Sequence, residues 1–165
     1  MPEKETIRRA RKDKHEGKAP STQAGEFVRE EIHHVREGKH GARSTKQAIA
    51  IGLSKARRSG VRLPPPKKGR VSKETREQAA SDAAAGKRPK RKVSRTRATA
   101  VRKALKREGR SAASRSALAK QARASARRRP ATERSAAARK AVRTKGPAGR
   151  SAAAKKAART RARRG

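Results

Sequence analysis

The feature that most constrains this chain is the excess of cations over anions between residues 87 and 165. This segment holds 30 Lys and Arg residues and 22 Ala residues against two acidic residues, Glu108 and Glu133, for a net charge of +28. Its like charges repel one another, and its few large apolar side chains bury too little surface to offset the entropy of ordering. We therefore expect an interaction tail that has no packed core of its own.

The whole chain shows the same bias in weaker form. Its 165 residues contain 51 Lys and Arg against 13 Asp and Glu, and aromatic residues make up 1%. This composition predicts a mostly disordered protein whose ordered parts are all-α. The lack of Cys excludes disulfides and thiolate metal sites, and no apolar run is long enough for a signal sequence or a membrane span. We expect a cytoplasmic protein.

A small helical hairpin is predicted in the first half of the chain. Its first helix, about residues 22–37, has apolar positions at helical spacing and ends at Gly38. Those positions are Ala24, Phe27, Val28, Ile32 and Val35. Its second helix, about residues 45–59, is capped by Ser44 or Thr45 and ends at Gly60. The apolar face of the second helix consists of Ala48, Ile49, Gly52, Leu53 and Ala56. The hairpin is too small to be more than marginally stable, so we expect a partner or self-association to support it.

Composition divides the chain into four segments. Residues 1–20 are a charged arm, residues 21–63 the hairpin, residues 64–92 a Pro-rich, basic linker, and residues 93–165 the basic tail. Gly and Pro residues separate short helix-compatible pieces at 72–85, 96–108, 111–128, 132–144 and 150–164. Residues 134–141 recur in similar form at 150–157.

Phosphate neutralisation is the chemistry that such a tail can perform. Each Lys or Arg docked on a duplex phosphate releases counterions, so ten engaged cations would give a log–log salt slope of about −9. No aromatic platform, RRM pattern or zinc-finger pattern is present for reading bases. The predicted nucleic-acid-binding residues are Arg43, Ser44, Thr45, Lys46, Arg57, Arg58, Lys67, Lys68, Lys87, Arg88, Lys90, Arg91, Lys92, Arg102, Lys103, Arg127, Arg128, Arg129, Arg139, Lys140, Lys155, Lys156, Arg163 and Arg164.

The second helix of the hairpin has two interpretations, and both stay open. Arg43, Ser44 and Thr45 stand at its N-terminus, where backbone N–H groups can accept a phosphate, so the helix can dock on a nucleic acid. Alternatively, its outer face is merely polar and basic. In either case, the acidic residues of the first helix can pair with nearby cations and compete with the nucleic acid; they are Glu26, Glu30, Glu31 and Glu37.

The four histidines are interpreted as surface residues. His33 with Glu37, and His34 with Glu30, have the i, i+4 spacing of a metal-binding pair. Adjacent histidines on a helix diverge by about 100°, however, and a third ligand is not evident. The sequence also contains no catalytic triad spacing, phosphate-binding loop or dinucleotide fingerprint. We expect no metal, no cofactor and no enzymatic activity.

Two stretches resemble a known family. Residues 25–32 (GEFVREEI) are followed by residues 44–60 (STKQAIAIGLSKARRSG). They resemble small, basic bacterial proteins of unknown function that share a KQAIAIGLS-x-ARR-x-G segment leading into Val-x-Leu-Pro. The resemblance covers about residues 20–66 and implies a bacterial source, but it implies no site residue because the function of that family is unassigned.

The tail is similar in composition to the Ala/Lys-rich tails of linker histones and bacterial histone-like proteins. Unlike linker histones, this chain has no Ser-Pro or Thr-Pro site and no winged-helix pattern before the tail. The sequence thus predicts a nucleoid-associated, histone-like protein that binds DNA without sequence preference. Two alternatives stay open: an RNA-binding or ribosome-associated protein, and a protein-interaction module that the tail tethers to nucleic acid. No membrane partner is expected.

Overall fold

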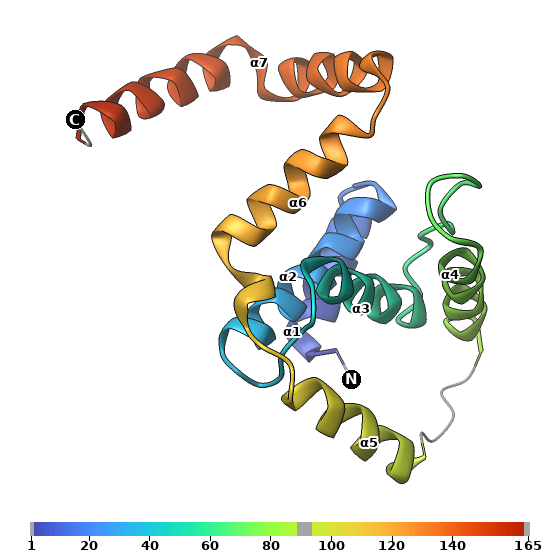
Figure 1. The fold of residues 1–165 in the computed structure, drawn as a ribbon. Coiled ribbons are helices and arrows are strands. Elements are labelled where there is room, and N and C mark those ends of the chain that lie inside the picture. Colours follow the sequence, from blue (N-terminus) through green and yellow to red (C-terminus); the bar gives the residue numbers. More distant parts are fainter. Residues whose placement is uncertain (1, 89–93, 164–165) are drawn as a thin grey trace. The chain divides into compact units, whose positions relative to one another are not determined.

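The computed structural model describes residues 2–88 and 94–163, and within these ranges the chain contains helices and no strand (Figure 1). The helices are α1 (Lys4–His15), α2 (Pro20–Arg36), α3 (Thr45–Arg58), α4 (Lys73–Ala85), α5 (Arg95–Lys106), the 3-10 helix η1 (Ser111–Ala113), α6 (Arg115–Arg127) and α7 (Ala131–Ala162). They form two compact units, residues 1–121 and residues 122–165. The prediction of an all-α protein is confirmed.

Glycines end the first three helices in the same way. Gly17, Gly38 and Gly60 have positive φ angles of 69°, 76° and 88°. After each of them a backbone N–H reaches back to the last turn, for example from Val61 to Ala56 O at 3.1 Å. This is the Schellman arrangement, in which glycine adopts the left-handed conformation without a steric penalty. The predicted helix ends at Gly38 and Gly60 are therefore confirmed.

Helices α2 and α3 form the predicted hairpin, and they approach closely at one glycine. Gly52 of α3 is buried. A Cβ atom placed on it would lie 2.7 Å from the Cα atom of Val28 and 3.0 Å from the carbonyl oxygen of Phe27. Ala48 and Ala56 on the same face of α3 are fully buried. The interface is therefore made by small residues of α3 lying on the backbone and apolar face of α2.

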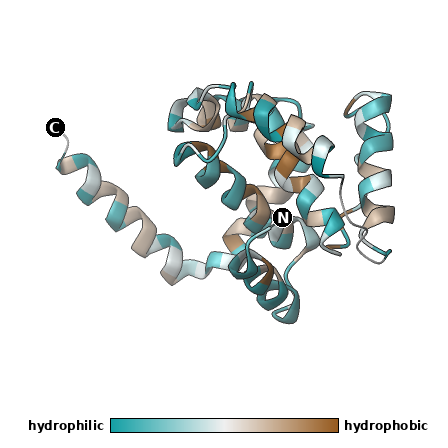
Figure 2. Cartoon of the chain, turned by 90° about the horizontal axis from the view of Figure 1, so that it is seen from below, coloured by the Kyte–Doolittle hydropathy of each residue, from teal (hydrophilic) through white to brown (hydrophobic). Residues whose placement is uncertain are grey.

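Two small apolar clusters complete the first unit. In one, Phe27 and Ala24 of α2 pack with Ala10 of α1 and Ala56 of α3. In the other, the α2 and α3 residues pack with Ala112 and Ala113 of η1 and with Leu118 of α6. Figure 2 shows hydrophobic colour confined to short stretches of a mainly hydrophilic chain. Residues of α1, η1 and α6 therefore pack against the hairpin.

The prediction that most of the chain is disordered is wrong, and the charged arm of residues 1–20 contains a helix. Helix α1 forms within that arm and packs on α2 through Ala10. The error has a physical cause: the prediction counted large apolar side chains, whereas much of the core is alanine. The buried alanines are Ala10, Ala24, Ala42, Ala48, Ala56, Ala79, Ala112 and Ala113. Alanine also has the highest intrinsic helix propensity and loses no side-chain entropy on folding.

Helix α7 buries no residue, unlike α1, α2, α3 and α4 of the first unit. Gly146, with φ 63° and ψ 174°, interrupts it just before Pro147, so two helical segments are joined at a kink. Their Ala, Arg and Lys residues are good helix formers, which accounts for the helix in the absence of packing. These segments correspond to the predicted pieces at 132–144 and 150–164. No helix among residues 2–88 and 94–163 combines the length and apolar character needed to cross a bilayer.

The close approach at Gly52 predicts that Gly52→Ala destabilises the first unit. The added methyl group meets backbone atoms of α2 that cannot rotate away, so the free energy of unfolding should fall by about 1–3 kcal/mol. Gly25 of α2 is the matched control, because a Cβ atom there meets nothing within 4 Å. Gly25→Ala should raise the stability by about 0.5–1 kcal/mol through helix propensity. Urea unfolding followed by circular dichroism measures both changes, and equal effects of the two substitutions would contradict the packing.

Candidate nucleic-acid interface

The N-terminus of α3 is held by its own side chains. The Ser44 hydroxyl accepts a hydrogen bond from Gln47 N at 3.2 Å, and Gln47 Oε1 accepts one from Arg43 N at 2.7 Å. Ser44 is therefore the N-cap, as predicted. Thr45 is buried, and its hydroxyl donates to Ala112 O at 2.7 Å. Of the side chains predicted to bind phosphate here, those of Arg43, Ser44 and Lys46 are exposed, whereas that of Thr45 anchors η1.

The two arginines at the end of α3 have different surroundings. Arg57 is 6% exposed, and its guanidinium donates to the carbonyl oxygens of Leu63 and Pro64. Burial lowers the pKa of Arg57 from its ordinary value, and the negative charge of Asp82 partly offsets this. Arg58 is exposed, but its Nε lies 2.7 Å from Asp82 Oδ1 of α4. Both arginines therefore help to hold the segments that follow α3.

The predicted cations of the linker and tail are exposed wherever the structure describes them. They are Lys67, Lys68, Lys87, Arg88, Arg102, Lys103, Arg127, Arg128, Arg129, Arg139, Lys140, Lys155, Lys156 and Arg163. Lys90, Arg91, Lys92 and Arg164 lie outside the described residues. Each cation of α7 stands on a helix that buries nothing. These side chains are consequently accessible to a large polyanion.

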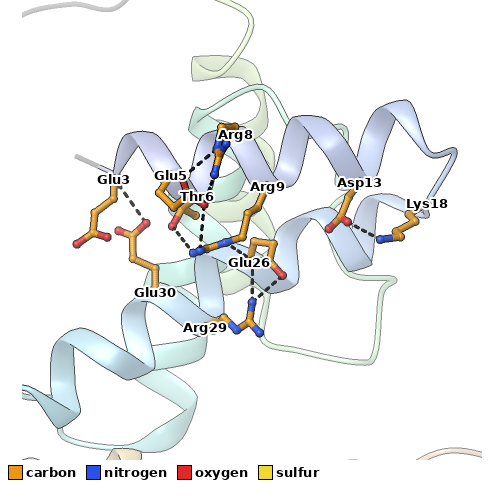
Figure 3. Close-up of polar contacts among 10 residues, drawn as sticks. All are labelled: Glu3, Glu5, Thr6, Arg8, Arg9, Asp13, Lys18, Glu26, Arg29 and Glu30. Carbon is orange, nitrogen blue, oxygen red and sulfur yellow. Dashed lines mark hydrogen bonds and ion pairs between the residues drawn. The ribbon is translucent and has the colours of Figure 1, made fainter.

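Acidic residues are concentrated where they pair within the first unit. At least ten acidic residues between positions 3 and 82 lie within ion-pair distance of a Lys, Arg or His residue in the part of the chain that the structure describes. Figure 3 shows one such group between α1 and α2, where Arg9 Nε lies 2.7 Å from Glu26 Oε2. After residue 87 only Glu108 and Glu133 are acidic. Positive charge in the tail therefore greatly exceeds any acidic charge there.

Sequence reasoning missed a buried charged cluster between α2 and α3. The side chains of Glu30 and Glu31 are 2% and 1% exposed. Lys55 of α3 reaches both carboxylates, at 3.5 Å from Glu30 Oε1 and 2.6 Å from Glu31 Oε2. The expected pairing of first-helix glutamates with second-helix cations thus occurs inside the fold. Helical spacing alone could not show it, because α1 and the 38–43 connection cover this side of α2.

The structure also brings together Glu31, His34 and His40, which the sequence interpretation left apart. One ligand atom from each lies within 4.8 Å of the others. Glu31 and His34 have i, i+3 spacing on α2, a spacing found in helical metal sites, and this was the available signal. His40 lies in the loop after α2, so its approach depends on the turn at Gly38.

The composition and the fold are those of a small, strongly basic protein that is helical within the described residues. Residues 5–68 match the model of a family described as "Family of unknown function (DUF6496)". The matched residues include α2 and α3 and most of α1, and they overlap the stretch whose resemblance was recognised in the sequence. No curated protein and no solved structure matches the chain. The core residues of η1 and α6 lie beyond the matched region.

The buried cluster predicts that Lys55→Met strongly destabilises the first unit. The substitution keeps most of the side-chain volume but leaves two buried carboxylates without their lysine, which should cost about 3–5 kcal/mol. Lys46→Met on the same helix is the control, since Lys46 is exposed and should change stability by less than about 0.5 kcal/mol. Urea unfolding at neutral pH distinguishes them. A Lys55 variant as stable as the Lys46 variant would show that the cluster does not support the fold.

Proposed function

We propose that this protein is a nucleoid-associated, histone-like architectural protein that binds duplex DNA without sequence preference, through phosphate neutralisation. The observation that carries the proposal is the separation of its charges. Acidic side chains are paired within the helical unit, whereas residues 87–165 hold 30 basic residues against two acidic ones, and the predicted binding cations among them are exposed where the structure describes them. Such an excess far exceeds the net charge of about 2–8 that keeps a small domain soluble.

The repeated pattern in α7 supports binding along an extended polyanion. Arg139, Lys140 and Arg143 have the same spacing as Lys155, Lys156 and Arg159, 16 residues later. Residues at i and i+4 lie on the same side of a helix, so each segment presents paired cations. Like charges at this spacing oppose helix formation, and bound phosphates remove that opposition. Docking on DNA and helix formation in α7 should therefore stabilise each other.

The same chemistry explains why little base selectivity is expected. Lysine and arginine contacts to phosphates position a protein but carry no sequence information. Aromatic residues, which stack on bases in many single-strand binders, make up 1% of the chain. Any preference would have to come from the exposed Arg43, Ser44 and Lys46 at the N-terminus of α3, where a helix can approach the backbone or a groove.

Neutralising three cations of α7 should weaken DNA binding more than neutralising three cations of α1. The test variant carries Arg139→Gln, Lys140→Gln and Arg143→Gln, and the control carries Lys4→Gln, Arg11→Gln and Lys14→Gln. All six residues are exposed, so each variant loses three charges without opening a core. Fluorescence anisotropy with a 30-base-pair duplex should show a log–log salt slope shallower by up to about 2.7 for the α7 variant.

The control variant should change that slope by clearly less, because the cations of α1 stand among acidic residues that reduce the local positive charge. Equal losses in the two variants would show that only the total charge matters, and that the tail is no interface. A greater loss in the α1 variant would contradict the proposal outright.

Competition between nucleic acids separates the proposal from its RNA-binding alternative. A preformed complex with duplex DNA is challenged with unlabelled duplex DNA of another sequence, and in parallel with structured RNA of equal nucleotide number. The proposal expects the unrelated duplex to compete as well as the original and the RNA to compete less well. If RNA competed at least tenfold more effectively than duplex DNA, the protein would be an RNA-binding protein and the proposal would be wrong.

A further inference from the structure

We propose that Glu31, His34 and His40 form a metal site that takes a zinc ion. The three side chains come from α2 and from the loop after it, and their ligand atoms lie within 4.8 Å of one another. Two imidazoles and one carboxylate are a ligand set that zinc accepts in proteins, whereas magnesium and calcium prefer oxygen ligands alone. The chain has no Cys to offer a competing thiolate site.

The contacts of His40 direct Nε2 of its ring toward Glu31. His40 Nδ1 lies 3.0 Å from Gly41 O, which can only accept a hydrogen bond, so Nδ1 carries the proton. In the neutral ring, Nε2 then carries a lone pair and no proton, so it can only accept a hydrogen bond. It lies 3.2 Å from Glu31 Oε1, which can likewise only accept one. A metal ion shared by the two atoms resolves this arrangement, and a backbone carbonyl on the second nitrogen is a common orienting partner of metal-bound histidine.

The distance between these two atoms suits a tetrahedral ion. With zinc–ligand distances of about 2.0–2.1 Å, the ligand atoms of a tetrahedral site lie about 3.3 Å apart. The observed 3.2 Å between Glu31 Oε1 and His40 Nε2 is close to that value. The rings of His34 and His40 stand edge to face with their centroids 6.0 Å apart, and the ligand atom of His34 lies within 4.8 Å of the other two, so His34 would have to approach the ion to complete the set.

A second observation points to a missing cation. Glu31 Oε1 and Glu30 Oε1 are buried, and neither accepts a hydrogen bond of acceptable geometry from the residues that the structure describes, although His40 Nε2 and Lys55 Nζ lie 3.2 Å and 3.5 Å away. Lys55 supplies one positive charge for the two carboxylates, which leaves a negative excess in a buried place. An uncompensated buried charge is costly, and a bound divalent cation would remove that cost.

Access and support for an ion are also present. An open depression is lined by Glu3, His34 and Lys39, among other residues, so one of the three ligand side chains, His34, borders solvent-accessible space. Glu3 Oε1 lies 2.8 Å from His34 Nε2, which puts a second carboxylate against the cluster. A bound ion would link α2 to the loop that leads into α3. The site would therefore fix the connection of the hairpin, independently of any nucleic acid.

The test uses the untagged full chain, freed of nucleic acid and treated with a chelator before ZnCl₂ is added. The chain has four histidines, of which His15 and His33 lie outside the cluster and serve as internal controls. Long-range ¹H–¹⁵N spectra of the imidazoles should show the His34 and His40 signals changing until one equivalent of zinc is bound. The His15 and His33 signals should not change over that range.

Calorimetric titration of variants with ZnCl₂ completes the test. His40→Ala should weaken zinc binding at least about tenfold, whereas His33→Ala, an exposed neighbour on α2, should leave it unchanged. If His40→Ala fails to fold, the spectra of the natural chain decide alone. No response of His34 and His40 to ~100 μM zinc would overturn the proposal, as would a response that His15 or His33 shares. A His40 ring that is doubly protonated and whose signals do not change with zinc would also overturn the proposal, because a proton would then occupy the position assigned to the metal.

Discussion

The contact between α2 and α3 at Gly52 is the constraint on which the rest of the first unit depends. Because Gly52 has no side chain, the backbone of α3 lies directly against Val28 and Phe27. That approach brings Lys55 to the buried Glu30 and Glu31. It also buries Ala48 and Ala56 in the core. The 38–43 loop then lies against residues 105–109, with Gly41 N donating to Leu105 O at 2.8 Å. Residues from the basic half of the chain are thereby built into the unit.

This construction also explains the distribution of charge. A core of alanines supplies less hydrophobic stabilisation than one of larger side chains, so ion pairs between helices carry more of the specificity of packing. Acidic residues of α2 and α4 make such pairs with cations of α1 and α3. Beyond η1 the helices bury no residue within the described ranges, and their cations face outward. The same separation of paired acidic residues in the first unit from exposed cations in the tail underlies the binding proposed for the tail.

The sequence predicted local structure better than it predicted packing. Helix termination at Gly38 and Gly60 and the N-cap at Ser44 depend only on residues close in the sequence, so they could be predicted. The burial of Glu30 and Glu31 depends on α1 and on a loop, and no periodicity within α2 reveals it. The contribution of Ala112 and Ala113 was missed because alanine in a basic segment indicates helix and not a core. His40 lies in the loop after α2, so helical spacing could not place it beside His34.

Among the predicted site residues, the exposed ones remain candidates, while Thr45 and Arg57 are better explained by the fold, since each bonds to a backbone carbonyl of a neighbouring segment. Sequence could identify cations but could not separate the accessible from the structural ones. That distinction requires the tertiary contacts of η1 and of the segment after α3.

The central claim, that the protein holds DNA by neutralising phosphates, is tested most directly by the salt dependence of its affinity. Dissociation constants for two duplexes of unrelated sequence are measured between about 50 and 200 mM salt. The account predicts a log–log slope of about −9, corresponding to roughly ten engaged cations, and the same slope and affinity for both duplexes. An affinity that is indifferent to salt, or one that differs strongly between the two sequences, would contradict it.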